Sequence, residues 1–138
     1  MLKVSMAVVA DAANISQEGK LNICGIFNSV TVHQLPAVHP WMVLVFEIEG
    51  DRSDAHAEHK MKLDMIDADG ASVLPPIEGE IKFGQVASGG TIRAPQILNI
   101  ANIQFKKFGR HDIKIILNGE VMAEVPINVI EHAKQVVK

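Results

Sequence analysis

The sequence has few of the residues on which common binding and catalytic sites are built. Its 138 residues include one cysteine, one tryptophan and no tyrosine, and aromatic residues make up 4% of the chain. Surfaces that bind single-stranded nucleic acid or carbohydrate usually depend on aromatic side chains, so both classes lose support. Thirteen Lys and Arg against sixteen Asp and Glu give a net charge of −3, with no basic block. We therefore expect no nucleic-acid partner.

Long apolar runs and paired cysteines are missing as well. No run approaches the ~20 apolar residues of a membrane-spanning helix. Residues 1–10 look superficially like a signal peptide but lack a basic n-region, and the apolar run ends at Asp11. The lone Cys24 cannot form an intrachain disulfide, which is typical of a reducing compartment. The expectation is a cytoplasmic protein with no membrane segment, in which residues 1–138 form a single domain.

The strongest positive signal is a β-hairpin near the C-terminus. Asn118-Gly119 lies between two runs of alternating apolar residues, the pattern of a two-residue type I′ turn, in which both central residues need a positive φ. Ile113, Ile115 and Leu117 share one face of the first strand. The face of the second strand is expected to carry Val121, Ala123, Val125, Ile127 and Val129. Pro126 places this second strand near a sheet edge or at a bulge.

The remaining apolar runs are short and are separated by turn residues. No 3.6-residue apolar period persists long enough for a major helix. This pattern predicts an all-β fold, an antiparallel, immunoglobulin-like β-sandwich. Gly25 indicates a bulge within its strand. Strands are expected over residues 1–10, 21–32, 41–49, 58–67, 77–83 and 97–105 (the last with an optional helical turn), loops over 11–20, 35–40 and 84–95, and a tail or short helix over 131–138.

Three segments carry a resemblance that spans nearly the whole chain. They are residues 6–27, the motif Pro36-Ala37-Val38-His39-Pro40, and residues 108–126 with their Leu-Asn-Gly-Glu turn. Together they resemble a family of short bacterial proteins of unknown function. The resemblance implies a compact single domain and brings no activity, cofactor or catalytic residue with it.

His56-Ala57-Glu58-His59 comes nearest to a metal-binding motif. Two histidines three residues apart could share an ion, with Glu58 or Asp54 supplying an oxygen ligand. However, the spacing is not that of His-Glu-x-x-His, and strand residues three apart face opposite sides. A solvated loop is therefore the preferred interpretation, and metal is the alternative.

Other candidate sites have simpler structural explanations. Asp67-Ala68-Asp69-Gly70 opens like a calcium loop, but Pro75 and Pro76 intrude before Glu78 and no helix flanks it, so a turn is expected. The loop 84–91 lacks the Gly-Lys-Ser/Thr ending of a phosphate-binding loop. Cys24 lies in an apolar run, so we expect it to pack inertly in the core. For Asp11 and Asn14 we expect local hydrogen bonds to loop backbone.

These observations predict a non-catalytic interaction or structural module that self-associates, with no cofactor. The strand 41–49 is apolar on both faces, as at a sheet centre or a subunit contact. Replacing Val45 or Phe46 by lysine should then give a folded monomer. An alternative hypothesis is a metal- or small-ligand-binding protein that uses His56 and His59. A third hypothesis, a component of a phage particle or secretion device, rests on fold analogy alone. The interface candidates are Trp41, Val43, Val45 and Phe46.

Overall fold

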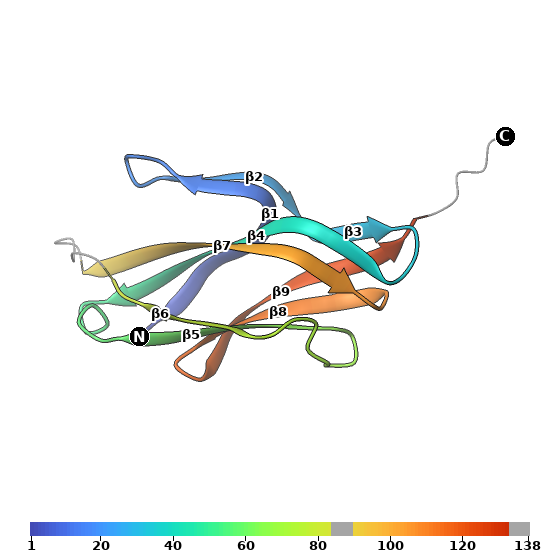
Figure 1. Ribbon diagram of the computed structural model, residues 1–138. Coiled ribbons are helices and arrows are strands. Elements are labelled where there is room, and N and C mark those ends of the chain that lie inside the picture. Colours follow the sequence, from blue (N-terminus) through green and yellow to red (C-terminus); the bar gives the residue numbers. More distant parts are fainter. Residues whose placement is uncertain (84–89, 133–138) are drawn as a thin grey trace.

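Two β-sheets form the protein. The computed structural model describes residues 1–83 and 90–132, and no helix occurs within these ranges. Figure 1 shows the sheets as two facing layers. The nine strands of these ranges are β1 (Lys3–Ile15), β2 (Leu21–Phe27), β3 (Ser29–Val32), β4 (Ala37–Asp51), β5 (His59–Ile66), β6 (Ile77–Ile81), β7 (Thr91–Phe105), β8 (Gly109–Leu117) and β9 (Glu120–Glu131).

The strand order confirms the all-β prediction and corrects one detail of it. The first sheet has the order β2-β1-β4-β7 and is antiparallel throughout. The second sheet has the order β3-β9-β8-β5-β6, and in it β3 runs parallel to β9. A wholly antiparallel sandwich was therefore a wrong prediction. The physical reason is a crossover at Asn28, because the single strand expected over residues 21–32 ends in one sheet and resumes in the other.

The hydrophobic core lies between the two sheets. Alternate residues of β4 (Met42, Leu44, Phe46 and Ile48) face inward and are buried. The second sheet contributes Leu63, Ile115 and Ile127 among others. Because β4 is flanked by β1 and β7, the prediction that this strand lies at a sheet centre is confirmed.

The β8–β9 hairpin contains the predicted turn. Asn118 has φ 50° and Gly119 has φ 82°, so both central residues take the positive values that a type I′ turn needs. Ile113 and its partners on β8 face the core as expected. On β9 the expected face holds from Ala123 onward, but Val121 is exposed. The reason is a register shift opposite Ile115 and Ile116, which inserts an extra residue and turns Val121 outward.

Replacing Gly119 by valine should lower the free energy of unfolding by about 1–3 kcal/mol. A β-branched residue tolerates φ 82° poorly, although a Cβ at Gly119 would meet no other atom within 4 Å. The cost would therefore come from the backbone alone. Urea denaturation of the variant and the parent protein measures this change in the free energy of unfolding. An unchanged value would contradict the type I′ turn at Gly119.

Several predicted boundaries were wrong. The loop expected over 35–40 is in part strand, since β4 begins at Ala37. Pro40 fits there because the pairing of β4 with β1 stops at Val43, and the register with β7 passes over Pro40 and Asn102. Pro126 follows the same rule and confirms the edge prediction, since it lies before the point where β9 begins to pair with β3.

The loops predicted over 11–20 and 84–95 are also shorter than expected. β1 continues to Ile15, and β7 begins at Thr91. Residues 84–89 of the predicted glycine-rich loop lie outside the described residues, as do 133–138 of the predicted tail. The tail predicted from residue 131 begins later than expected, because β9 extends to Glu131.

Candidate interaction site

The β1–β2 hairpin leaves the sheet at one joint. The pairing of β1 with β4 ends at Ala10 and Val43, and beyond it β1 pairs with β2. Their register is constant from Val9 to Ile15, but the pair Asp11 and Gly25 is missing. Figure 1 shows the hairpin beyond this point turning back over the outer face of the first sheet. We call residues 12–24 the arm and the pair Asp11 and Gly25 the joint.

The arm covers an apolar patch on the outer face of the first sheet. In a flat sheet, Leu21 would lie about five residues beyond Val43, because it pairs with Ile15. Instead it packs against a buried cluster that contains Val43 and Val45. Val45 is 0% exposed, although its side chain lies on the face turned away from the main core. The cluster consists of Ala10, Val43 and Val45, against which Met6, Val8, Ala13, Leu21, Ile23 and Ile97 pack.

The joint requires a glycine. Gly25 has φ 74°, a value that residues with a side chain rarely adopt. A Cβ at this position would also lie 2.4 Å from Oδ2 of Asp11 and 2.9 Å from its Cγ. The predicted bulge at Gly25 is thus a bend in which the Asp11 side chain closes over the glycine backbone. Asp11 and Asn14 were expected to hydrogen-bond loop backbone, but both lie in strand β1. The Oδ1 of Asn14 accepts a hydrogen bond from Asn22 Nδ2 at 3.0 Å.

The structure separates the four predicted interface residues. Phe46 is 0% exposed in the core between the sheets, and Val43 and Val45 lie under the arm. Trp41 is 47% exposed. Of the four, the folded chain therefore offers Trp41 to a partner. Sequence reasoning found the strand but not the arm, which buries its second apolar face.

Trp41 lies on a stretch of β4 that is paired on one side only. Where β1 departs, residues 37–42 of β4 pair with β7 on one side, and within the described residues they have no strand on the other. Val38 and Pro40, on the same stretch, are exposed as well. The side chain of Trp41 is on the same face as Val43 and Val45, because residues alternate along a strand. Exposed apolar side chains beside an unpaired strand edge are the features of an association surface.

The predicted solvated loop at the histidine motif was wrong for His59, which begins β5. His59 is buried, and both of its ring nitrogens take part in hydrogen bonds. Nε2 donates to the carbonyl oxygen of Asp54 at 2.8 Å, and Nδ1 accepts from Asn118 Nδ2 at 3.0 Å. His56 is exposed on the preceding loop. Since a metal ligand needs a free nitrogen, this arrangement favours a structural role for His59. Within residues 1–83 and 90–132, no three His, Cys, Asp or Glu side chains gather as metal ligands would.

The aspartate-rich turn and the cysteine also have defined places. Oδ1 of Asp67 accepts the backbone N–H groups of Asp69 at 2.9 Å and Ala71 at 3.0 Å, which confirms the predicted turn. These bonds, with the nearby charge of Lys107, lower the pKa of Asp67. Cys24 was expected in the core but is exposed on the arm, because the apolar run around it belongs to a two-stranded ribbon rather than to the sandwich.

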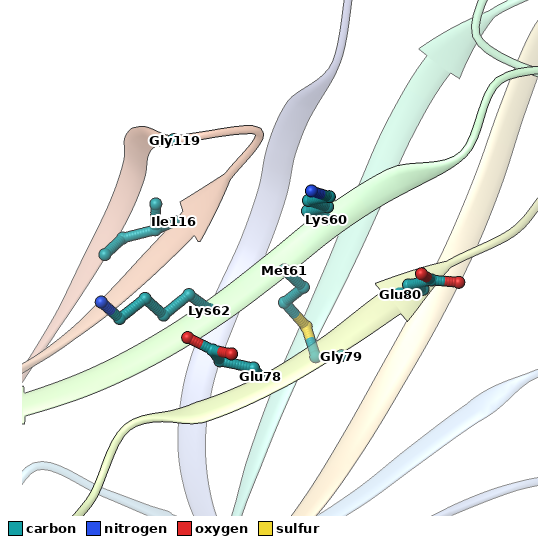
Figure 2. Close-up of a pocket in the computed structure, with 8 residues that line it drawn as sticks. All are labelled: Lys60, Met61, Lys62, Glu78, Gly79, Glu80, Ile116 and Gly119. Carbon is teal, nitrogen blue, oxygen red and sulfur yellow. The ribbon is translucent and has the colours of Figure 1, made fainter.

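A shallow groove lies on the second sheet, along β5 and β6 and beside the β8–β9 turn. Its volume is about 530 Å³, within the range of ligand sites. Lysines of β5 face glutamates of β6 across the strands, since Lys60 pairs with Glu80 and Lys62 with Glu78. Figure 2 shows these side chains spread along the groove rather than converging on one point. The remaining lining residues are Met61, Gly79, Ile116 and Gly119. Spread charges of both signs do not define a ligand, so the groove is a lesser candidate than the Trp41 surface.

Comparison with known proteins gives a family but no activity. No curated protein matches the chain. Within the described ranges, the structure has no helix long and apolar enough to cross a bilayer. Among solved structures, a Pseudomonas fluorescens alkylpurine DNA glycosylase, AlkC, bound to DNA with an abasic site analogue is similar at 14% identity and a TM-score of 0.40. That match covers 94% of this chain and 30% of the glycosylase, a likeness too distant to bear on function. The model of a family of unknown function, DUF6941, matches residues 5–130, and the chain belongs to this family.

Proposed function

We propose that this protein is a non-catalytic interaction module that self-associates through the outer face of its first sheet. The observation that carries the proposal is the exposed Trp41 beside Val38 and Pro40, on a stretch of β4 with one open edge. Tryptophan is among the residues that contribute most to protein interfaces, because it buries a large area at a small entropic cost. An open strand edge adds unpaired backbone groups that a further strand could satisfy.

The hydrogen bonds of two buried histidines support the same choice. His59 and His111 are buried and bonded within the chain, the latter through Nδ1 and the Gly109 carbonyl oxygen at 3.0 Å. A catalytic acid or base would need a ring nitrogen directed toward a substrate. Their geometry instead supports a structural role.

Intrinsic fluorescence tests the proposal directly. Trp41 is the only tryptophan and the chain has no tyrosine, so its emission reports on this surface alone. On raising the protein concentration, we expect the emission of Trp41 to move to shorter wavelength as the indole is covered. Replacing Trp41 by serine should abolish association in sedimentation experiments. Phe108, an exposed aromatic residue in the β7–β8 turn, provides the matched control, since its replacement by serine should leave association intact. Equal effects of the two substitutions, or none, would refute the proposed surface.

We also propose an immunoglobulin-like sandwich and a cytoplasmic location. The strand order supports the fold. The neighbours β5, β8 and β9 correspond to strands C, F and G of an immunoglobulin domain, and β1, β4 and β7 correspond to strands A, B and E of the opposing sheet. An exposed free Cys24 supports a reducing compartment. Inter-strand nuclear Overhauser effects in solution would test the first proposal, and the oxidation state of Cys24 in cells would test the second.

A further inference from the structure

We infer that the arm is exchanged between two copies of this chain, so that the arm of each copy covers Val43 and Val45 of the other. This inference rests on the proposed self-association and names its mechanism. The structure itself shows what fits the apolar patch, because the chain's own arm occupies it. A second copy presents the same arm and the same patch, so an exchanged pair would form the same contacts between chains.

The arm is held to the patch by apolar packing. Within the described residues, the hydrogen bonds of the arm close on the arm itself. They comprise the β1–β2 ladder, the turn bonds between Ser16 and both Gly19 and Lys20, and the bond between Asn14 and Asn22. Undocking the arm would therefore expose Val43 and Val45 without breaking a hydrogen bond to the sheet. Redocking on a second copy would restore the apolar contact in full.

The joint permits opening. In the folded-back state the pair Asp11 and Gly25 is absent from the ladder, and Gly25 takes φ 74°, which glycine adopts as readily as a negative value. A straight joint would let this pair form and would extend β1 along the open edge of β4. By continuation of the register, Ala12 would then lie opposite Trp41. Opening would thus pair the free edge and partly cover Trp41 in the same movement, which links the arm to the proposed association surface.

Isotope-filtered NMR on the unaltered protein distinguishes exchange from other contacts. Chains labelled with 15N and chains labelled with 13C are unfolded together, refolded as a mixture, and the dimer fraction is isolated. Exchange predicts nuclear Overhauser effects between arm protons (Leu21, Ile23) of one label and patch protons (Val43, Val45) of the other. If the dimer shows these contacts only within chains of one label, the exchange is refuted while self-association stands. If no dimer forms at any concentration, both proposals fail.

A pair of glycine variants gives an independent test. Gly25→Ala would place a methyl group 2.4 Å from Oδ2 of Asp11 in the folded-back joint. It should therefore shift the population toward the exchanged dimer, raising the ratio of dimer to monomer about tenfold. Gly19→Ala is the matched control. Gly19 also has a positive φ, 85°, but a Cβ there meets nothing within 4 Å, so the dimer fraction should not change. A smaller dimer fraction for Gly25→Ala than for Gly19→Ala would overturn the inference.

Discussion

Replacing Phe46 by lysine is expected to unfold this protein rather than to release a folded monomer. Phe46 is completely buried between the two sheets, within the main core. Removing a buried phenylalanine costs about 3–5 kcal/mol, and an unpaired charge in its place costs more. Since a domain of this kind is stable by about 5–15 kcal/mol, most of that margin would be lost. Circular dichroism during thermal and urea denaturation would show the loss.

Trp41→Lys is the matched control for this substitution, because it introduces the same charge five positions earlier on the same strand. Trp41 is 47% exposed, and a surface substitution usually changes stability by no more than about 0.5 kcal/mol. A folded, monomeric Phe46→Lys variant with the unfolding midpoint of the parent would contradict the placement of β4 between the sheets. It would instead support the original expectation that Phe46 lies at a subunit contact.

Replacing Asn118 by alanine should lower the free energy of unfolding by about 2–4 kcal/mol. The side chain of Asn118 joins the β8–β9 turn to the start of β5. Its Oδ1 accepts the backbone N–H of Lys60 at 2.9 Å, and its Nδ2 donates to Nδ1 of the buried His59 at 3.0 Å. Alanine would leave both partners unsatisfied, and it also tolerates φ 50° less readily than asparagine. Urea denaturation measures the change.

Asn102 separates the backbone effect from the lost hydrogen bonds. It has φ 52°, almost the same as Asn118, but its exposed side chain makes no hydrogen bond to the described residues. Asn102→Ala should therefore cost only about 1 kcal/mol. If Asn118→Ala costs no more than Asn102→Ala, the bridge to His59 and Lys60 contributes nothing, and the histidine would again be available for other roles.

The sequence predicted well where local pattern and tertiary structure agree. The Asn-Gly turn of β8 and β9 was identified because its backbone requirement is local to two residues. The strand expected over residues 58–67 corresponds to β5 for the same reason, since alternate residues (Met61, Leu63 and Met65) are buried. The face of β9 failed only at Val121, where a register shift depends on the partner strand and leaves no local signal.

The association surface was less accessible to sequence reasoning, because it depends on long-range packing. Nothing local to Val43 and Val45 shows that they would be covered by Leu21 and Ile23, some twenty residues earlier in the chain. The polar residues of 11–20 suggested a loop, whereas they form the end of a strand and its turn. Gly25 was recognised as a bulge, but its role as the joint of an arm follows only from its position opposite Asp11.

Native mass spectrometry of the untagged protein, across a range of concentrations, tests the central claim most directly. Self-association through the outer face of the first sheet predicts a defined species of twice the 15.0 kDa chain mass, with no additional mass from metal or ligand. The same species should disappear in Trp41→Ser and persist in Phe108→Ser. A parent protein that remains a 15.0 kDa monomer at every concentration would contradict the account.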